Sequence, residues 1–523
     1  MCGKLVSPTT LLLLVGAANA PGQDLSAFRS DQIGRLAHYV ADAIQPSGLV
    51  RDSLVLDPTR PSFHPATPDA AGFALVALAA LDRVDAIADA DVQALKVLNA
   101  YAGRTAGVAP ARSADGHFLH FIDPVTGADT PGWDDSYSPI GSALLAAGAL
   151  FAANHFDAAG SPVAGDIRSV SESLTASIDF DAAIHPSLDG RVYLDMTPQG
   201  GGAGGAVRPW NEYQLVVSLA LRQRGDNDRA VAVRRQWLNP DAAPIKYLGR
   251  TPTLTDNPDA FAPAFWVQQA NYFNGDFRHS DGFQAYLANQ ATVDRAYSRS
   301  VLGEPYRYGL TAGVSPQGYH ADRIADHPNN VFSPEAVAAW GDLATLLDFA
   351  ADQPPDSDPR YRYGLVRVSA DQPGWVPGDA GLVDHLFLLF GLVESIDPSF
   401  FSSRVFAPLD AADYNFDGVV DAADYTVWRD VRGGLLDNLA PDGDLSGVVD
   451  GQDYSVWSTR YALANHALAN HALASNALAK QNAGAGGPVP EPSAPTLAAC
   501  AAACWLLLFR SCRAARGQPG SAG

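Results

Sequence analysis

Residues 142–156 read SALLAAGALFAANHF, a strongly apolar stretch of the Ala and Leu type that favours helix. Four further stretches have the same character, at 68–81, 211–224, 334–349 and 384–396. Polar connections rich in Gly and Pro separate them. About ten helical segments joined by long loops predict concentric helical hairpins rather than a simple bundle. Long loops at one end of such a scaffold are where a binding site is expected.

The length and charge of the chain limit what it can be. Its 523 residues exceed one ordinary core, so two or more structural units are expected. The net charge of −22 argues against a nucleic-acid partner, because phosphate binding requires clustered Lys and Arg. The cysteines Cys2, Cys500, Cys504 and Cys512 all lie near the chain ends. The folded part therefore has no disulfide framework.

Both ends of the chain have the composition of sorting segments. Residues 1–20 combine Lys4, an apolar run and an Ala-Asn-Ala ending, which predicts a cleavable secretory signal and export to the cell surface or beyond. Residues 489–516 contain Pro-Glu-Pro, an apolar stretch and trailing arginines. This segment resembles the Pro-Glu-Pro C-terminal sorting signals of Gram-negative bacteria, which implies an exosortase-type processing enzyme. A simple C-terminal membrane anchor is the alternative. Residues 464–488 are a low-complexity linker.

Two twelve-residue stretches have the spacing of calcium loops. Residues 413–424 read DYNFDGVVDAAD, and residues 442–453 read DGDLSGVVDGQD, 29 residues later. Oxygen-bearing side chains fall at places one, three, five, nine and twelve, glycine at six, and a backbone carbonyl serves at seven. The predicted calcium ligands are Asp413, Asn415, Asp417, Val419, Asp421, Asp424, Asp442, Asp444, Ser446, Val448, Asp450 and Asp453.

Each loop is followed by an aromatic helix start, YTVW or YSVW. The pair, from 408 to 463, resembles a type I dockerin module, in which place twelve is Asp. The resemblance implies a small all-α module that two structural Ca²⁺ ions fold, and a cohesin-type protein partner.

The helical region carries carboxylates beside aromatic residues in its loops. Zinc, phosphate-loop and nucleophile-elbow motifs are absent from the sequence. Aromatic rings stack on sugar faces, and paired carboxylates supply the acid and base for glycosidic cleavage. Singly, most of these acidic residues would be explained as helix caps or ion pairs, and most of the aromatic residues as core. Carboxylates and aromatic residues occur together in the stretches 116–156, 207–221 and 265–297, and this repeated combination favours a functional role for them.

In order and wording these stretches resemble the glycoamylase-like domain, an (α/α)6-toroid group that includes endo-β-1,2-glucanases. The matching pieces include GHFLHFIDPVTG, WNEYQLV and YGLTAGVSPQGY, and they cover most of residues 50–400. The resemblance implies an (α/α)6 domain over 25–405. The candidate catalytic residues are Glu212, Asp135 and Asp276. The candidate substrate-binding residues are His120, Asp123, Asp134, Trp133, Trp210, Tyr213, Arg278 and Tyr319.

Two departures from the family pattern affect the predicted chemistry. Where the family reads Ser-x-Ile-Asp-Thr-Ala-Leu-Leu, this chain has SPIGSALL, so Gly141 replaces a carboxylate. Where the family reads Tyr-Gly-Phe-x-Asp-Ala-Phe, residues 363–370 read YGLVRVSA. Asp134 and Asp135 are nearby carboxylates that could compensate.

Three functions follow from these patterns. The first is a secreted glycoside hydrolase that acts on a neutral polysaccharide, a glucan, and carries a calcium-folded docking module. The second is a carbohydrate-binding or scaffold protein that keeps the fold without the chemistry, for which Gly141 is the argument. The third, a lyase for acidic polysaccharide, requires basic residues in the cleft and fits the charge poorly.

Overall fold

The computed structural model describes most of the helical region and both loop repeats. The described residues are 25–57, 59, 64–223, 228–238, 244–247, 249–254, 262–304, 307–324, 326–353, 358–416, 418–432 and 440–463. The predicted signal at 1–20, the linker at 464–488, the sorting segment at 489–516 and the four cysteines lie outside them. The chain divides into two compact units, Met1–Trp457 and Ser458–Gly523.

The described part of the first unit is mainly helical, as the sequence predicts. Its α-helices are α1 (Leu25–Ala43), α2 (Pro68–Arg83), α3 (Ala90–Tyr101), α4 (Pro139–Ala159), α5 (Ala164–Ala176), α6 (Gln214–Ala220), α7 (Asp228–Leu238), α8 (Ala264–Phe273), α9 (Gly275–Arg278), α10 (Asp281–Ser300), α11 (Pro334–Ala339), α12 (Leu343–Asp352), α13 (Leu382–Glu394) and α14 (Ala422–Val431). Short 3₁₀ turns occur at η1 (Asp181–Ala183), η2 (Pro359–Tyr361) and η3 (Phe401–Ser403).

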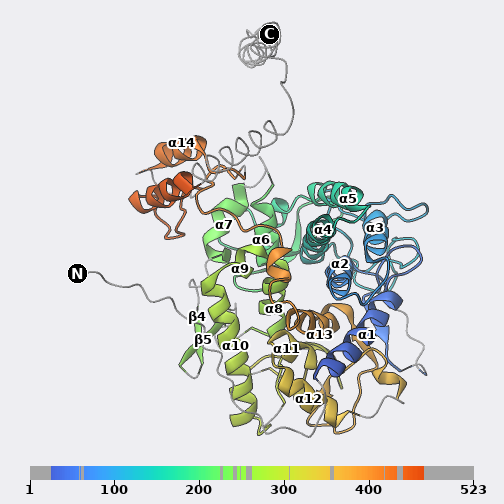
Figure 1. The fold of residues 1–523 in the computed structure, drawn as a ribbon. Coiled ribbons are helices and arrows are strands. Elements are labelled where there is room, and N and C mark those ends of the chain that lie inside the picture. The colour runs from blue at the N-terminus through green and yellow to red at the C-terminus, as the bar shows by residue number, and fades with distance from the viewer. Residues whose placement is uncertain are drawn as a thin grey trace, which may run out of the picture. The chain divides into compact units, whose positions relative to one another are not determined.

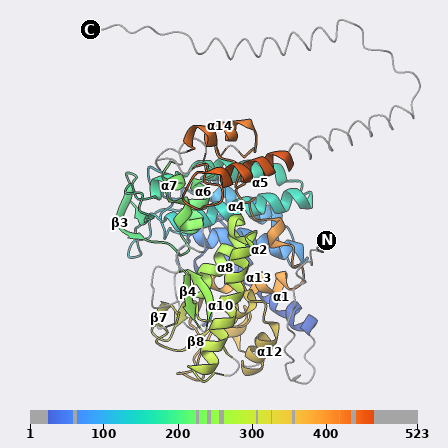
Figure 2. The same ribbon diagram turned by 90° about the vertical axis from the view of Figure 1, so that its left-hand side faces the viewer.

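The described strands form two-stranded antiparallel pairs. They are β1 (Ser53–Val55) with β10 (Asp379–Gly381), β2 (Val192–Met196) with β3 (Gly202–Val207), β4 (Pro244–Tyr247) with β5 (Arg250–Leu254), β6 (Ala312–Ser315) with β7 (Gly318–Ala321), and β8 (Val331–Phe332) with β9 (Val368–Ser369). Figure 2 shows β3, β4 and β7 on one side of the helices.

The helices alternate along the chain between an inner ring and an outer layer. Helices α2, α4, α6, α8, α11 and α13 each pack on the next, and α13 packs back on α2, which closes the ring. Helices α1, α3, α5, α7, α10 and α12 pack on the outside of that ring (Figure 1). Each outer helix is joined in sequence to an inner one, so the architecture is a closed series of helical hairpins.

Glycines allow the inner helices to approach each other closely. A Cβ on Gly72 of α2 would lie 2.2 Å from the Leu144 carbonyl oxygen of α4, and one on Gly148 would lie 2.3 Å from the Gly72 oxygen. A Cβ on Gly391 of α13 would lie 2.1 Å from the Ala338 oxygen of α11. Since these distances are far below van der Waals contact, only glycine fits at these three positions of the two crossings.

Helix α4 shows why the opening stretch of sequence is so apolar. Ser138 accepts a hydrogen bond from the Gly141 N–H at 3.0 Å, Pro139 begins the helix, and Gly160 ends it with a φ of 71°. Among the described helices, α4 is the one long and apolar enough to cross a membrane, but 83% of that apolar window is buried inside the protein. Its apolar surface therefore faces the other helices of the core.

The two calcium-type repeats pack against each other with an internal symmetry. Helix α14 follows the first repeat, and a second helix starts at Gly451 in the second repeat. The Trp428 indole donates to the Asp450 carbonyl at 2.8 Å, and the Trp457 indole donates to the Asp421 carbonyl at 2.9 Å. Each repeat thus contributes a tryptophan that binds the place-nine carbonyl of the other.

Candidate active site

The inner helices begin at one end of the ring, and acidic residues lie at several of these starts. Asp69, Glu335 and Asp384 lie in the first turns of α2, α11 and α13. Glu212 lies two residues before α6, and Gly141 occupies the first turn of α4. A helix N-terminus stabilises a nearby negative charge, so this end of the ring, termed the mouth, accommodates carboxylates.

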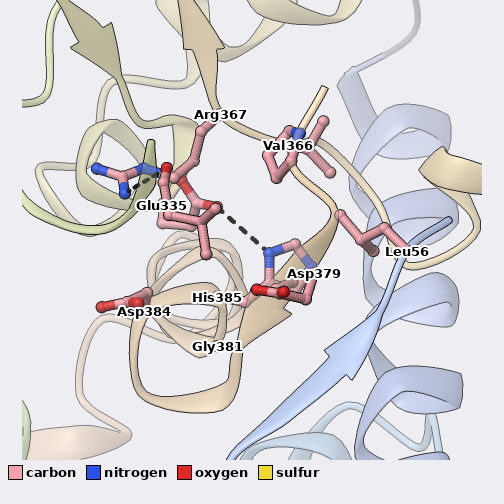
Figure 3. Close-up of a pocket in the computed structure, with 11 residues that line it drawn as sticks. Leu56, Glu335, Val366, Arg367, Asp379, Gly381, Asp384 and His385 are labelled. Carbon is pink, nitrogen blue, oxygen red and sulfur yellow. Dashed lines mark hydrogen bonds and ion pairs between the residues drawn. The ribbon is translucent and has the colours of Figure 1, made fainter. Parts of the chain in front are cut away.

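A pocket that is partly open to solvent lies beside the starts of α11 and α13. Figure 3 shows Glu335 and His385 facing one another in it. His385 Nδ1 lies 3.3 Å from Glu335 Oε1, and its Nε2 donates to the Tyr363 carbonyl at 2.9 Å. Nε2 must carry a proton to donate to this carbonyl. A hydrogen bond between His385 Nδ1 and Glu335 Oε1 therefore requires a second proton, either on Nδ1 or on the carboxyl group.

Asp384 is the pocket carboxyl group with the most perturbed acidity. Its side chain is buried, and its Oδ1 has no hydrogen-bond partner among the described residues. Burial raises the pKa of Asp384 well above its usual range, and the negative charges of Glu335, Asp52 and Asp69 add to the rise, which Arg367 partly opposes. A raised pKa of this kind favours the protonated form of the carboxyl group, which is the form that a general acid in glycosidic cleavage uses.

The β1–β10 pair brings two further carboxylates from opposite ends of the helical region to the mouth. Val55 pairs with Asp379, and the Leu382 N–H donates to the Asp52 carbonyl at 2.8 Å. Burial and the neighbouring Asp69 raise the pKa of Asp52 to about 7, against the lowering effect of His120 and His64. The Asp379 side chain, in contrast, remains 29% exposed, with His64 Nε2 3.6 Å from its Oδ2.

An aromatic strip, defined here as His64, Trp133, Phe121 and His120, leads away from these carboxylates. The ring centroids of His120 and Phe121 are 4.1 Å apart, those of Phe121 and Trp133 4.9 Å, and those of Trp133 and His64 6.2 Å. His120 Nε2 lies 3.9 Å from Asp69 Oδ2. Trp133 is 38% exposed, so the strip offers an accessible aromatic face next to the carboxylates.

Two predicted site residues, Asp134 and Asp135, lie next to His120 of this strip. His120 Nδ1 is 3.5 Å from Asp134 Oδ2, and Asp134 also accepts from the Ser136 hydroxyl at 2.6 Å. Burial acts to raise the pKa of Asp134, but the hydrogen bonds from Ser136 and the neighbouring His120 together outweigh it, so the net pKa is lowered. Asp135 is exposed next to it.

Tyr319, another predicted residue, lies with the same carboxylates. Its side chain on β7 is 67% exposed. The surrounding protein nevertheless raises the pKa of its hydroxyl, and the negative charges of Asp384 and Asp52 add to the rise.

The series of charged groups continues from Asp134 toward Glu212. Burial raises the pKa of Asp195 on β2, and the charge of Asp134 adds to the rise. Burial also raises the pKa of Tyr213, and the charges of Glu212 and Asp195 contribute. Asp134 and Asp195 thus lie between Glu212 on one side of the mouth and Asp384 on the other.

Trp210 and Tyr213 correct the sequence-based prediction of sugar-binding side chains. Trp210 is 1% exposed and packs against Phe277 and Phe283 in a small core. Tyr213 is 5% exposed and donates to the Leu194 carbonyl at 3.0 Å. Since a buried ring offers no face to a sugar, both residues support the fold around Glu212 instead.

Asp276 and Arg278 lie at the other end of the ring, and this corrects the prediction that Asp276 works beside Glu212. They follow the C-terminus of α8, and Asp276 accepts from Arg222, just beyond the C-terminus of α6, at 2.8 and 3.0 Å. Arg278 pairs with Glu394, the last residue of α13. Both therefore hold helix ends together, away from the mouth.

Asp123 has a local role in the structure. Its Oδ1 accepts from the N–H groups of Val125 and Thr126 and from the Thr126 hydroxyl, at 2.8 to 3.1 Å. These bonds close a turn. Despite the opposing effect of burial, they lower the pKa of Asp123.

The two departures from the family pattern both lie at the mouth. A Cβ on Gly141 would be 3.0 Å from Pro68 Cγ, beside the start of α2. Arg367, in the segment YGLVRVSA, lines the pocket and is 4% exposed. Its guanidinium donates to the Ser333 hydroxyl at 2.7 Å and to the Thr311 and Val314 carbonyls at 2.8 and 3.1 Å. These bonds occupy the guanidinium with protein acceptors.

Sequence reasoning missed several of the mouth carboxylates: Asp52, Asp69, Glu335, Asp379 and Asp384. A signal was present for three of them, because the apolar stretches PDAAGF, PEAVAAW and LVDHLF each place an acidic residue in the first helical turn. If these helices form a ring, their first turns share one mouth. Asp52 and Asp379 had no such signal, since a short long-range strand pair positions them.

The second calcium-type loop brings three carboxylates close together. In the second loop, one oxygen from each of Asp442, Asp444 and Asp453 lies within 4.8 Å of the others. The glycines at place six have φ values of 85° and 88°, and their N–H groups donate to the place-one carboxylates Asp413 and Asp442 at 2.7 and 2.8 Å. Hard oxygen donors in this arrangement fit Ca²⁺. Asp417 lies outside the described residues.

No protein-family model and no curated protein sequence matches this chain. Solved structures do resemble its fold. An endo-β-1,2-glucanase from Chitinophaga pinensis, in complex with sophorotriose and glucose, has 17% identity and a TM-score of 0.61, over 73% of this chain and 95% of that one. A β-1,2-glucanase from Parabacteroides distasonis has 15% identity and a TM-score of 0.60, over 73% and 58%.

An endo-β-1,2-glucanase from Talaromyces funiculosus, in complex with β-1,2-glucan, has 12% identity and a TM-score of 0.50, over 74% of this chain and 93% of that one. At such identities the likeness concerns the fold alone. The chain has a mainly α fold shared with glycoside hydrolases.

Proposed function

We propose that this chain is a glycoside hydrolase that cleaves a neutral glucan at the mouth of an (α/α)6 toroid. One observation carries the proposal: the same pocket at the mouth holds a buried carboxyl group whose pKa is raised, Asp384, and a more accessible carboxyl group, Asp379. Two carboxyl groups in such different environments are suited to separate acid and base roles. Several of the proteins that share the fold are β-1,2-glucanases, so β-1,2-glucan is the first substrate to test.

Glu212 is the second candidate for the acid, from the other flank of the mouth. The pattern Trp-Asn-Glu-Tyr supports it, as does its place just before an inner helix. In this proposal Trp133 stacks on a sugar ring, and His120 and Tyr319 lie where they contact the bound glucan.

The test measures the release of oligosaccharides from a panel of neutral β- and α-glucans. We expect Asp384→Asn and Asp379→Asn each to lose at least about 100-fold in turnover while still binding glucan, because each removes a proton-transfer group. Asp294→Asn is the matched control, since burial also raises the pKa of Asp294 to about 7 but its helix, α10, lies in the outer layer. If Glu212→Gln is inactive and Asp384→Asn is active, Glu212 is the acid.

A binding protein without turnover is the alternative, and the two departures at Gly141 and Arg367 favour it. This alternative predicts no release from any glucan by the unchanged chain, with binding still detectable as gel retardation. A lyase for acidic polysaccharide gains no support, because Asp379, Asp384 and Glu335 line the described pocket and Arg367 is occupied by protein acceptors.

We also propose that the two loop repeats bind Ca²⁺ and form a docking module of the dockerin type, with a cohesin-type partner. The close carboxylates of the second loop and its match to the first support the metal. Bound calcium would neutralise these carboxylates and order the loops. Export through the N-terminal signal and processing by an exosortase-type enzyme are proposed from the sequence of the chain ends.

A further inference from the structure

Helix α7 belongs to the outer layer of the ring and also contacts the loop repeats. Two consecutive residues on it, Arg234 and Arg235, make these contacts. Arg234 is 7% exposed, and its guanidinium donates to the carbonyls of Asp442 and Ala440. Arg235 Nε donates to the Leu445 carbonyl at 3.0 Å. All three acceptors are backbone carbonyls at or next to the second loop.

The first loop meets the same helix. The guanidinium carbon of Arg234 lies 5.5 Å from the centroid of the Phe416 ring. Phe416 is the place-four residue of the first loop, as Leu445 is of the second, and both have a positive φ, 54° and 56°. Corresponding residues of the two repeats thus meet adjacent arginines of one helix.

The glycine at place six of the second loop allows a close approach to α7. A Cβ on Gly447 would lie 2.7 Å from Arg235 Nη1. The segment that leads into the repeats is also fastened to the ring. Asp276 accepts from the Leu409 N–H at 2.7 Å, and Arg222 donates to the Ala407 carbonyl at 2.9 Å.

We infer that the loop repeats dock on Arg234 and Arg235 of α7 within the same molecule, so that calcium binding and folding of the helical ring form one cooperative equilibrium. A guanidinium buried against backbone carbonyls is satisfied only when those carbonyls are in their loop positions. Calcium orders the loops, and therefore it also stabilises α7 and the ring on which α7 packs. The module is fixed on the ring rather than tethered to it.

The inference rests on the proposed calcium binding, and the experiment separates the two. The full chain is studied with CaCl₂ or with excess chelator, by isothermal titration for binding and by scanning calorimetry for unfolding. We expect calcium to raise the midpoint of the main transition, which contains the ring, by on the order of 5 °C.

Arg235→Ala is the main variant, because it removes an exposed side chain and is expected to fold. It should bind calcium, yet show at most half of the calcium-induced shift in the main transition. Arg234→Met is the stronger variant. Arg429→Ala is the matched control, since exposed Arg429 pairs with Asp430 within α14, and it should keep the full shift.

Three outcomes decide the matter. Binding with a shift of the main transition that Arg235→Ala reduces supports the inference. Binding that moves only a separate minor transition, or a shift that Arg235→Ala leaves intact, overturns the inference and keeps the calcium site. No binding heat and no shift overturns the calcium proposal and the inference with it.

Discussion

Asp52 illustrates how a single side chain at the mouth responds to its surroundings. It lies between the strand pair and the start of α2, close to Asp69 and Asp379. Burial and these negative charges raise its pKa to about 7, against about 3.9 in an unfolded chain. Asp52 in the folded protein thus binds a proton over a range in which the unfolded chain has released it.

This difference in pKa predicts how stability depends on pH. The proton favours the folded state below about pH 4, and that contribution is lost as the pH rises through about 7. It amounts to at most about 4 kcal/mol, since three pKa units correspond to that energy. We expect Asp52→Asn to remove this loss, so its free energy of unfolding relative to the unchanged chain should rise between pH 4 and pH 8.

Urea unfolding at several pH values measures the effect, and the difference between the two proteins cancels the contributions of other groups. A difference that stays constant across this range would show that Asp52 is ionised throughout.

The position of such carboxylates was only partly accessible from the sequence. Distinctive sequence motifs identified Glu212, His120, Asp134 and Tyr319 as candidates. The structure places these residues around the mouth. Asp276 lies in an equally distinctive motif, but it pairs with Arg222 at the far end of the ring. A local sequence motif identifies unusual residues, but it does not reveal which end of a helix faces the site.

At the scale of the elements, the close crossing of α2 and α4 fixes the spacing of the inner ring. Gly72 and Gly148 face each other across it, and neither has room for a Cβ. The apolar periodicity predicted both helices, because burial on all sides leaves few polar residues. It did not predict which glycines form the crossing, since contacts between distant segments leave no local periodicity.

We expect Gly72→Ala to destabilise the protein by about 2–3 kcal/mol, because the added methyl group would overlap the Leu144 carbonyl. Gly34→Ala in α1 is the matched control. Its Cβ would meet nothing within 4 Å, so it should stabilise by about 0.5–1 kcal/mol through helix propensity. Urea unfolding compares the two, and equal effects of the same sign would contradict the crossing.

At the scale of the whole molecule, the ring has two ends with different roles. The mouth holds Asp52 and Asp384, whose pKa values are raised. The far end holds carboxylates paired with arginines, Asp276 with Arg222 and Glu394 with Arg278. The same far end receives the segment leading to the loop repeats through Leu409. The sequence predicted the helical region and the repeats as successive segments, but not that paired charges join them.

We therefore expect Asp276→Ala to lower stability by about 3–5 kcal/mol, because it leaves the half-buried Arg222 without its carboxylate. Turnover on glucan, measured below the melting temperature, should change less than about threefold, since Asp276 lies away from the mouth. A large loss of turnover in a stable, folded variant would return Asp276 to the catalytic group.

The tryptophan exchange between the two repeats has a consequence for anyone who wishes to transplant them. The Trp428 indole donates to a carbonyl of the second repeat, and the Trp457 indole donates to one of the first. Either repeat alone would therefore carry an indole without its acceptor. The shortest fragment that contains the complete pair of repeats therefore extends at least to Trp457. A fragment cut between the repeats should therefore be insoluble when expressed, whereas the intact pair keeps both indole hydrogen bonds.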